Sequence, residues 1–244
     1  MNNSGTLYGI GVGPGDAELI TVKAVKLPAE MDLIFTASST KNDFSLAMEI
    51  AGPHLSNGIE TRTLSFPMTK DKAVTDRAWD ENAGIIAEEV EKGRNVAFLT
   101  LGDPLTYSTF GYILQKMKTR YPHLPIKIIP GITSYQAAAA RTKTTLVEAE
   151  ESLLLTSGAF GGENIRELNA AVENVVLLKA YKNVADIVDA LSESEMLTNS
   201  IAISRCGREN EAVITDITEL IEKKPDYWTL IIAKKEQQED DSER

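Results

Sequence analysis

Tyr8-Gly-Ile-Gly-Val-Gly-Pro-Gly-Asp16 decides the fold, because an apolar run passes here into a turn built of alternating glycines, a proline and an aspartate. Two later segments have the same form: Phe98-Leu-Thr-Leu-Gly-Asp-Pro-Leu-Thr-Tyr-Ser-Thr109 and Ile128-Ile-Pro-Gly-Ile-Thr-Ser134. Each predicts a strand that ends abruptly, since glycine opens backbone conformations closed to other residues and proline removes an amide donor. Ligands of open α/β sheets bind outside the carboxyl ends of the strands, so the three turns predict one binding pocket.

The first turn does not carry a dinucleotide-binding fingerprint. A G-x-G-x-x-G pattern that starts at Gly9 meets Pro14, and one that starts at Gly11 meets Asp16. Pro14 removes an amide that a pyrophosphate would use, and Asp16 places a carboxylate where that anion would lie. A nucleotide-binding oxidoreductase is therefore a disfavoured alternative from a different class, and a non-catalytic ligand-binding module is a third.

Predicted strands and helices alternate along the whole chain, which indicates an α/β fold with substantially parallel sheets. Strands are predicted at 6–12, 32–37, 59–64, 95–100, 125–129, 152–156, 174–179, 199–204, 211–215 and 227–233. Helices are predicted at 16–30, 43–51, 73–92, 107–120, 133–142, 163–173 and 183–191. Pro28 conflicts with an uninterrupted first helix and predicts a kink or an end there.

Ten strands are many for one sheet in a chain of 244 residues, so two lobes are expected. Pro122, Pro125 and Pro130 stiffen the crossing between them. We therefore expect an N-terminal α/β lobe over 1–122 and a C-terminal α/β lobe over 123–233, each with a mixed, largely parallel sheet and flanking helices. The polar residues 234–244 predict a disordered tail.

The composition limits the compartment and the partners. The chain is 43% apolar, contains no run as long as a membrane span and begins with a polar segment, so a cytoplasmic globular protein is expected. Its net charge of −11 disfavours nucleic acid or an anionic membrane as a partner. Cys206 is the only cysteine and there are two histidines, so an internal disulfide is excluded and no protein-bound metal is expected.

The glycine turns together resemble those of the tetrapyrrole methylase family, whose members use S-adenosylmethionine and have two α/β lobes. The resemblance covers residues 5–233 and its landmarks occur in order: 11–16, Leu101-Gly-Asp-Pro104, Pro130-Gly-Ile-Thr-Ser134 and Ser204-Arg-Cys-Gly207. Residues 5–13, Leu64-Ser-Phe-Pro-Met68, 98–109 and Tyr227-Trp-Thr-Leu-Ile231 resemble the branch that methylates carbon 20 of precorrin-2 or cobalt-precorrin-2 in cobalamin biosynthesis. A methylase of another precorrin or of uroporphyrinogen III is the alternative within the family.

The resemblance also implies a set of residues that bind S-adenosylmethionine, the methyl donor. They are Pro14, Gly102, Asp103, Thr106, Thr133, Ser134, Lys179 and Gly207. The glycines allow close approach of the backbone, and Thr133 and Ser134 offer hydroxyls at a predicted helix N-terminus, where they would equally serve as caps. Cys206 follows an apolar strand and is expected to be a small buried residue.

Three residues are catalytic candidates, although the chain shows no Ser-His-acid signature. Asp103 is the first, as a base or an electrostatic group, with a purely structural cap of its turn as the alternative. Tyr227 and Tyr107 follow, since a phenol can donate, accept or stack, with a place in the core as the alternative.

The tetrapyrrole substrate carries many carboxylates, so basic side chains must offset the negative average charge of the chain. Eight are available near predicted strand ends or loops: Lys41, Arg62, Lys70, Arg141, Lys143, Lys182, Arg205 and Arg208. We expect two or three of these to contact the substrate. The resemblance further implies a homodimer.

Overall fold

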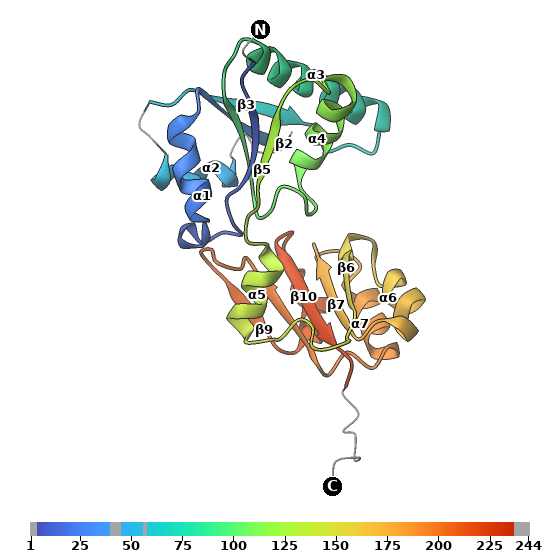
Figure 1. The fold of residues 1–244 in the computed structure, drawn as a ribbon. Helices are drawn as coiled ribbons and strands as arrows, with labels where there is room; N and C mark the ends of the chain where they lie inside the picture. The colour runs from blue at the N-terminus through green and yellow to red at the C-terminus, as the bar shows by residue number, and fades with distance from the viewer. Residues whose placement is uncertain (1–3, 40–44, 56–57, 237–244) are drawn as a thin grey trace. The chain divides into compact units, whose positions relative to one another are not determined.

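The computed structural model describes residues 4–39, 45–55 and 58–236 and divides into two compact units, Met1–Ser134 and Tyr135–Arg244 (Figure 1). The division between the two units lies twelve residues beyond the boundary predicted after residue 122. The strand β5 (Ile126–Ile129) pairs in parallel with β1 (Leu7–Gly11), so the segment after Pro122 completes the first sheet instead of opening the second unit.

The first unit holds a five-stranded sheet in the order β3-β2-β4-β1-β5, in which all neighbouring strands are parallel. Its other strands are β2 (Leu33–Ser39), β3 (Thr61–Phe66) and β4 (Val96–Thr100). All five lie where the sequence predicts them. Because the strands are parallel, the three glycine turns all follow carboxyl ends at one edge of this sheet.

Helices cover both faces of the first sheet, with α1 (Val22–Lys26) and α2 (Leu46–Ala51) on one side and α3 (Lys72–Glu91) and α4 (Thr109–Arg120) on the other (Figure 1). Side chains alternate between the two cores along each strand. In β4, Phe98 packs in the core under α3 and α4, whereas the neighbouring Leu99 packs in the core under α1 and α2. Burial on both faces explains the nearly continuous apolar runs of these strands.

The predicted helix 16–30 is wrong as a single element. It divides into a 3-10 turn (Ala17–Leu19), the helix α1 and a second 3-10 turn (Leu27–Glu30) that contains Pro28. Thr21 accepts a hydrogen bond from Ala24 N and so starts α1 anew. Pro28 ends the α-helix as predicted, because its ring lacks the amide that the next helical bond requires.

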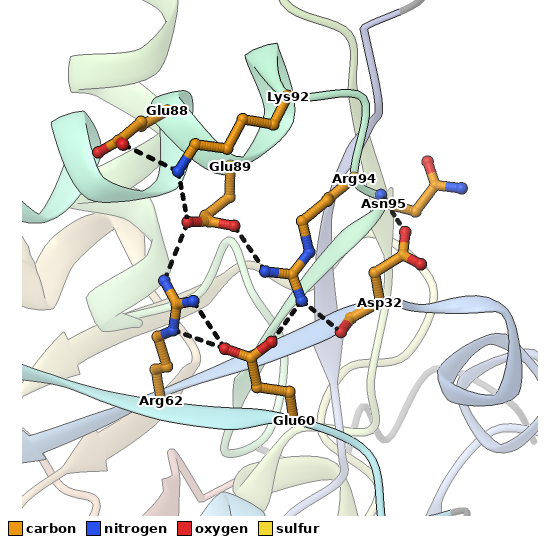
Figure 2. A network of polar contacts seen from close by, with 8 residues as sticks. All are labelled: Asp32, Glu60, Arg62, Glu88, Glu89, Lys92, Arg94 and Asn95. Atoms are coloured by element: carbon orange, nitrogen blue, oxygen red, sulfur yellow. Dashed lines mark hydrogen bonds and ion pairs between the residues drawn. The ribbon is translucent and has the colours of Figure 1, made fainter.

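A network of ion pairs joins the amino-terminal ends of the strands, opposite the glycine turns (Figure 2). At its centre is Glu89 of α3, whose side chain is 6% exposed and which pairs with Arg62, Lys92 and Arg94 at 3.0, 3.1 and 2.6 Å. Burial raises the pKa of Glu89, but hydrogen bonds from these three cations outweigh it and hold the pKa at about 2. The carboxylate is therefore ionised at neutral pH.

The second unit holds a mixed sheet in the order β6-β7-β10-β8-β9. Its strands are β6 (Leu153–Ser157), β7 (Asn174–Leu178), β8 (Ser200–Ser204), β9 (Ala212–Ile214) and β10 (Thr229–Lys234), all at predicted positions. Only β6 and β7 pair in parallel, so this sheet is mixed as expected but less parallel than predicted. The short link from β8 to β9 forms a hairpin, and β10 runs antiparallel between β7 and β8, which accounts for the difference.

Four helices belong mainly to the second unit: α5 (Ser134–Thr142), α6 (Glu163–Leu168), α7 (Val184–Glu193) and α8 (Leu220–Lys223). The predicted helix 163–173 ends at Leu168 and continues as a 3-10 turn (Asn169–Ala171), and α8 was not predicted. One core joins α6, α7 and α8 to one face of the sheet. No described helix combines the length and the apolar character that crossing a membrane requires.

The predicted disordered tail begins too early. Lys234 ends β10, Lys235 N donates to Glu173 O at 2.8 Å, and Glu236 accepts a hydrogen bond from Thr198 at 2.6 Å. The rest of the predicted tail, 237–244, lies outside the described residues.

Candidate functional site

The three glycine turns meet in the first unit, as the sequence predicts. Gly102 N donates to Gly13 O at 2.7 Å, and Gly13 N donates to Gly102 O at 3.4 Å, so the first two turns form a short antiparallel bridge. Gly13 and Gly102 have φ angles of +86° and +68°, a region in which glycine avoids the strain that a side chain would meet. Glycine is therefore needed at both positions.

Gly131 brings the third turn against the other two at van der Waals distance. A Cβ atom at Gly131 would lie 2.1 Å from the carbonyl oxygen of Gly102 and 2.9 Å from the carbonyl carbon of Gly11. A Cβ atom at Gly11 would lie 2.4 Å from the same oxygen. Backbone atoms fill the positions where side chains of Gly11 and Gly131 would lie, so glycine at these positions allows the three turns to pack this closely.

Asp103 connects two of the turns through its carboxylate. Its Oδ1 accepts a hydrogen bond from Leu105 N at 2.8 Å, within its own turn, and its Oδ2 accepts one from Gly131 N at 3.1 Å, in the third turn. The sequence alone suggested a cap of the local turn but not the contact with Gly131. These two bonds favour a positioning role for Asp103.

The other predicted site residues of the first unit lie along the same edge of the sheet. Pro14 is buried in the first turn, and Thr106 is partly buried in the second. Thr133 is 8% exposed and directly precedes α5, which begins at Ser134, so the predicted helix N-terminus is confirmed. Tyr107 is 51% exposed with a φ of +48°, which is strained for a residue with a bulky side chain and is a feature that gathers at functional sites.

Two of the predicted residues of the second unit come together at the carboxyl edge of β6, β7 and β8. Lys179 directly follows β7 with a φ of +58°, and its ammonium nitrogen lies 5.6 Å from the ring centroid of Tyr227. The ring of Tyr227 also meets those of Tyr181 and Trp228 edge-on, at 5.3 and 5.1 Å between centroids. This edge therefore presents aromatic faces together with cations, a surface that suits flat ligands.

Gly207 lies in the loop after β8, which Glu211 closes. One carboxylate oxygen of Glu211 accepts a hydrogen bond from Gly207 N at 2.7 Å, and the other accepts one from Arg141 of α5 at 2.5 Å. Both bonds hold the pKa of Glu211 below its ordinary value. Burial, the largest cause, and the nearby carboxylate of Glu211 raise the pKa of Cys206 to about 11, so Cys206 is a small buried residue as predicted.

The basic candidates differ in what they contact. Arg62 belongs to the ion-pair network at the opposite edge of the first sheet, so the prediction that placed it near a strand exit is wrong (Figure 2). Arg62 lies at the start of β3, and the residues around it gave no sign of its partner Glu89 on α3. Arg141 pairs with Glu211 and Arg205 pairs with Asp226, whereas Lys41 lies outside the described residues.

Sequence reasoning missed Glu211 and Asp226, the two carboxylates that hold the loops of this edge. Asp226 accepts hydrogen bonds from Ser204 at 3.2 Å and Trp228 N at 2.8 Å, in addition to the ion pair with Arg205. The only signal in the sequence is a carboxylate two residues before Trp228, which fits a turn cap.

The comparison with known proteins identifies the family. A family model described as Tetrapyrrole (Corrin/Porphyrin) Methylases matches residues 6–221. The chain belongs to this family. The methylase is 31% identical over 234 residues to a cobalt-precorrin-2 C(20)-methyltransferase of Salmonella typhimurium, and the match covers 96% of this chain and 98% of that protein. Family membership rules out the oxidoreductase alternative.

Two solved structures share the fold of the methylase. A cobalt precorrin-4 methyltransferase of cobalamin biosynthesis matches with a TM-score of 0.72 and 21% identity, over 94% of each chain. Uroporphyrin-III C-methyl transferase from Thermus thermophilus, complexed with S-adenyl homocysteine, matches with a TM-score of 0.64 and 20% identity, over 94% of this chain and 97% of that one. The predicted α/β fold is confirmed.

Proposed function

We propose that the methylase transfers a methyl group from S-adenosylmethionine to carbon 20 of precorrin-2 or cobalt-precorrin-2, in the cytoplasm and as a homodimer. The observation that carries the proposal is the meeting of three glycine turns at the carboxyl edge of a parallel sheet in a chain of this family. The Salmonella typhimurium relative bears the name of this reaction. A methylase of another precorrin or of uroporphyrinogen III is the alternative.

The residues present fit S-adenosylmethionine, which supplies an electrophilic methyl group when bound. Outside its own chain neighbours, an added Cβ atom at Gly102 would meet only Ile132 O at 3.9 Å and Thr133 Cα at 4.0 Å, both ordinary van der Waals distances. Gly102, Thr106 and Thr133 offer backbone and hydroxyl groups in the first unit. In the second unit, Lys179 offers a cation beside the ring of Tyr227, and Gly207 lies in the loop after β8. The proposed binding set is Pro14, Gly102, Asp103, Thr106, Thr133, Ser134, Lys179 and Gly207.

Positioning is the main task that this proposal gives to the protein. A reduced tetrapyrrole brings its own nucleophilic carbon, so no activated side chain is required. Orientation of two bound reactants can lower a barrier by about 7–11 kcal/mol. The closely packed turns around Gly11 and Gly131 suit that task. Tyr107 and Tyr227 are the side chains that we propose for contact with the reacting groups, and Asp103 is the third candidate, as a base or as a positioning group.

Product analysis tests the function directly. The purified protein is incubated with S-adenosylmethionine labelled in its methyl group and with precorrin-2, cobalt-precorrin-2 or uroporphyrinogen III in separate reactions. We expect a single labelled methyl group at carbon 20 of one or both forms of precorrin-2, located by mass spectrometry and NMR. Labelling of uroporphyrinogen III with none of precorrin-2 would support the alternative instead.

Asp103→Asn separates positioning from proton transfer. An amide has one oxygen to accept a hydrogen bond, so either Leu105 N or Gly131 N would face its NH₂ group. We expect the free energy of unfolding to fall by about 1 kcal/mol, with a single-turnover rate within about tenfold of the wild type. A fall of about 10²-fold or more at unchanged stability would assign Asp103 as a base. Tyr107→Phe and Tyr227→Phe, which remove only a hydroxyl, are the matched tests of the two phenols.

A further inference from the structure

Arg208 is a cation of the second unit with a buried hydrogen-bond donor that has no acceptor among the described residues. Its guanidinium carbon lies 5.1 Å from the ring centroid of Trp228, the residue directly before β10. The Nη1 atom of this group is shielded from solvent and has no hydrogen-bond acceptor within the described part of the chain. A buried charged donor without an acceptor costs free energy, so such groups in native proteins call for an explanation.

Two carboxylates of this edge, Asp226 and Glu211, are engaged with other partners. Asp226 pairs with Arg205 and also accepts from Ser204 and from Trp228 N. Glu211 pairs with Arg141 and accepts from Gly207 N. These two carboxylates thus pair with Arg205 and with Arg141 of α5, and the guanidinium of Arg208 has no ion pair among the described residues.

The backbone fixes Arg208 in this place. Arg208 N donates to Arg205 O at 3.0 Å, and Glu211 N donates to Arg208 O at 3.2 Å, so the residue lies inside a tight turn. The ring of Trp228 lies against the guanidinium, and a planar fork of this kind can match a carboxylate in two parallel hydrogen bonds. Less ordering entropy is lost on binding because the side chain is held in advance.

We propose that Arg208 binds a carboxylate of a ligand of the methylase, with the adjacent ring of Trp228 holding the guanidinium in position. The inference rests on the proposed function, since both reactants carry this group. One source is the amino-acid carboxylate of S-adenosylmethionine, and the other is an acetate or propionate side chain of the tetrapyrrole. The shared chemistry is a bidentate guanidinium–carboxylate pair, and the experiment separates the two sources.

The test measures binding by titration calorimetry, with three probes and without catalysis. S-Adenosylhomocysteine carries the amino-acid carboxylate, 5′-methylthioadenosine has the same nucleoside without it, and uroporphyrin is a stable tetrapyrrole with eight carboxylates. We expect Arg208→Gln to weaken binding of one carboxylate probe by at least about tenfold, and to leave 5′-methylthioadenosine unchanged. The probe that is affected identifies the source of the carboxylate.

Two further variants control for charge and for folding. Arg77→Gln makes the same substitution at an exposed arginine of α3 for which the structure shows no ion pair among the described residues, so both carboxylate probes should bind it normally. Arg208→Lys keeps the charge but loses the planar fork, and we expect an intermediate loss. Thermal melting and the circular dichroism spectrum establish that each variant is folded.

Trp228 gives a second readout at the same place. The chain has two tryptophans, so Trp79→Phe leaves Trp228 as the only one. A carboxylate that pairs with Arg208 should change the fluorescence of Trp228 in that background, and Arg208→Gln should remove the change.

The possible results separate the inference from the function on which it rests. If folded Arg208→Gln binds both carboxylate probes within twofold of Arg77→Gln, or loses 5′-methylthioadenosine to the same extent, the role of Arg208 is wrong while the function stands. If the wild type binds neither S-adenosylhomocysteine nor uroporphyrin, the proposed function is wrong, and the assignment of Arg208 falls with it.

Discussion

Gly131→Ala is expected to lower the free energy of unfolding by about 2–3 kcal/mol and to abolish binding of S-adenosylhomocysteine. The new Cβ atom would lie 2.1 Å from Gly102 O and 2.9 Å from the backbone of Gly11, and backbone atoms cannot move aside as a flexible side chain can. The turn would have to shift, which also breaks the hydrogen bond from Gly131 N to Asp103. Urea denaturation and titration calorimetry on the same preparation measure both effects.

Gly111→Ala is the matched control. Gly111 lies in α4, and a Cβ atom there would meet no atom within 4 Å. Alanine favours the helix over glycine, so we expect stability to rise by up to about 1 kcal/mol, with ligand binding unchanged. Equal tolerance of alanine at Gly131 and Gly111 would contradict the close packing of the three turns.

The positions of the strands could be predicted because each strand has a recognisable pattern in its own local sequence. Apolar runs that end in glycine or proline set off β1, β4 and β5, and all ten predicted strands occur in the structure. The direction in which a strand pairs with its neighbours is not recorded in such a local pattern. The apolar pattern of β10 is the same whether it pairs parallel or antiparallel, so its antiparallel place between β7 and β8 was not visible.

Contacts between distant residues explain the other differences. The domain boundary depends on β5 pairing with β1, and no local pattern around Pro122 records that pairing. Arg62 was a candidate for ligand binding because it is basic and lies near a predicted strand end or loop. Its partner Glu89 lies on α3, far along the chain. Asp103 was recognised as a turn cap from its neighbours, whereas its bond to Gly131 depends on how the turns meet.

Glu89→Gln is expected to destabilise the protein at neutral pH by about 2–3 kcal/mol. The side chain of Glu89 is almost fully buried and faces Arg62, Lys92 and Arg94 (Figure 2). A neutral amide of the same shape would leave these three cations close together without their shared carboxylate, and its NH₂ group would face one of them. The midpoint of urea denaturation at pH 7 measures the loss.

Glu60→Gln is the control within the same network. Glu60 also pairs with Arg62 and Arg94, at 2.6 and 2.5 Å, but its side chain is 44% exposed. Water replaces much of what an exposed carboxylate gives to its partners, so the loss should be clearly smaller than for Glu89→Gln. Equal losses would mean that burial of Glu89 does not set the strength of the network.

The pH dependence gives the second test of Glu89, and its sign follows from the direction of the pKa shift. The folded pKa of about 2 lies below the ordinary value of 4.5, so the folded state binds the proton less readily than the unfolded state. The stabilisation is therefore complete above pH 4.5 and is lost as the pH falls from 4.5 towards 2.

The difference in stability between the wild type and Glu89→Gln should be constant from pH 7 to pH 5 and should shrink below that range. Other carboxylates with lowered pKa values, Asp226 and Glu211 among them, are protonated to the same extent in both proteins, so their contributions cancel in this difference. A difference that stays unchanged down to pH 3 would show that the charge of Glu89 contributes nothing and that the substitution acts through shape alone.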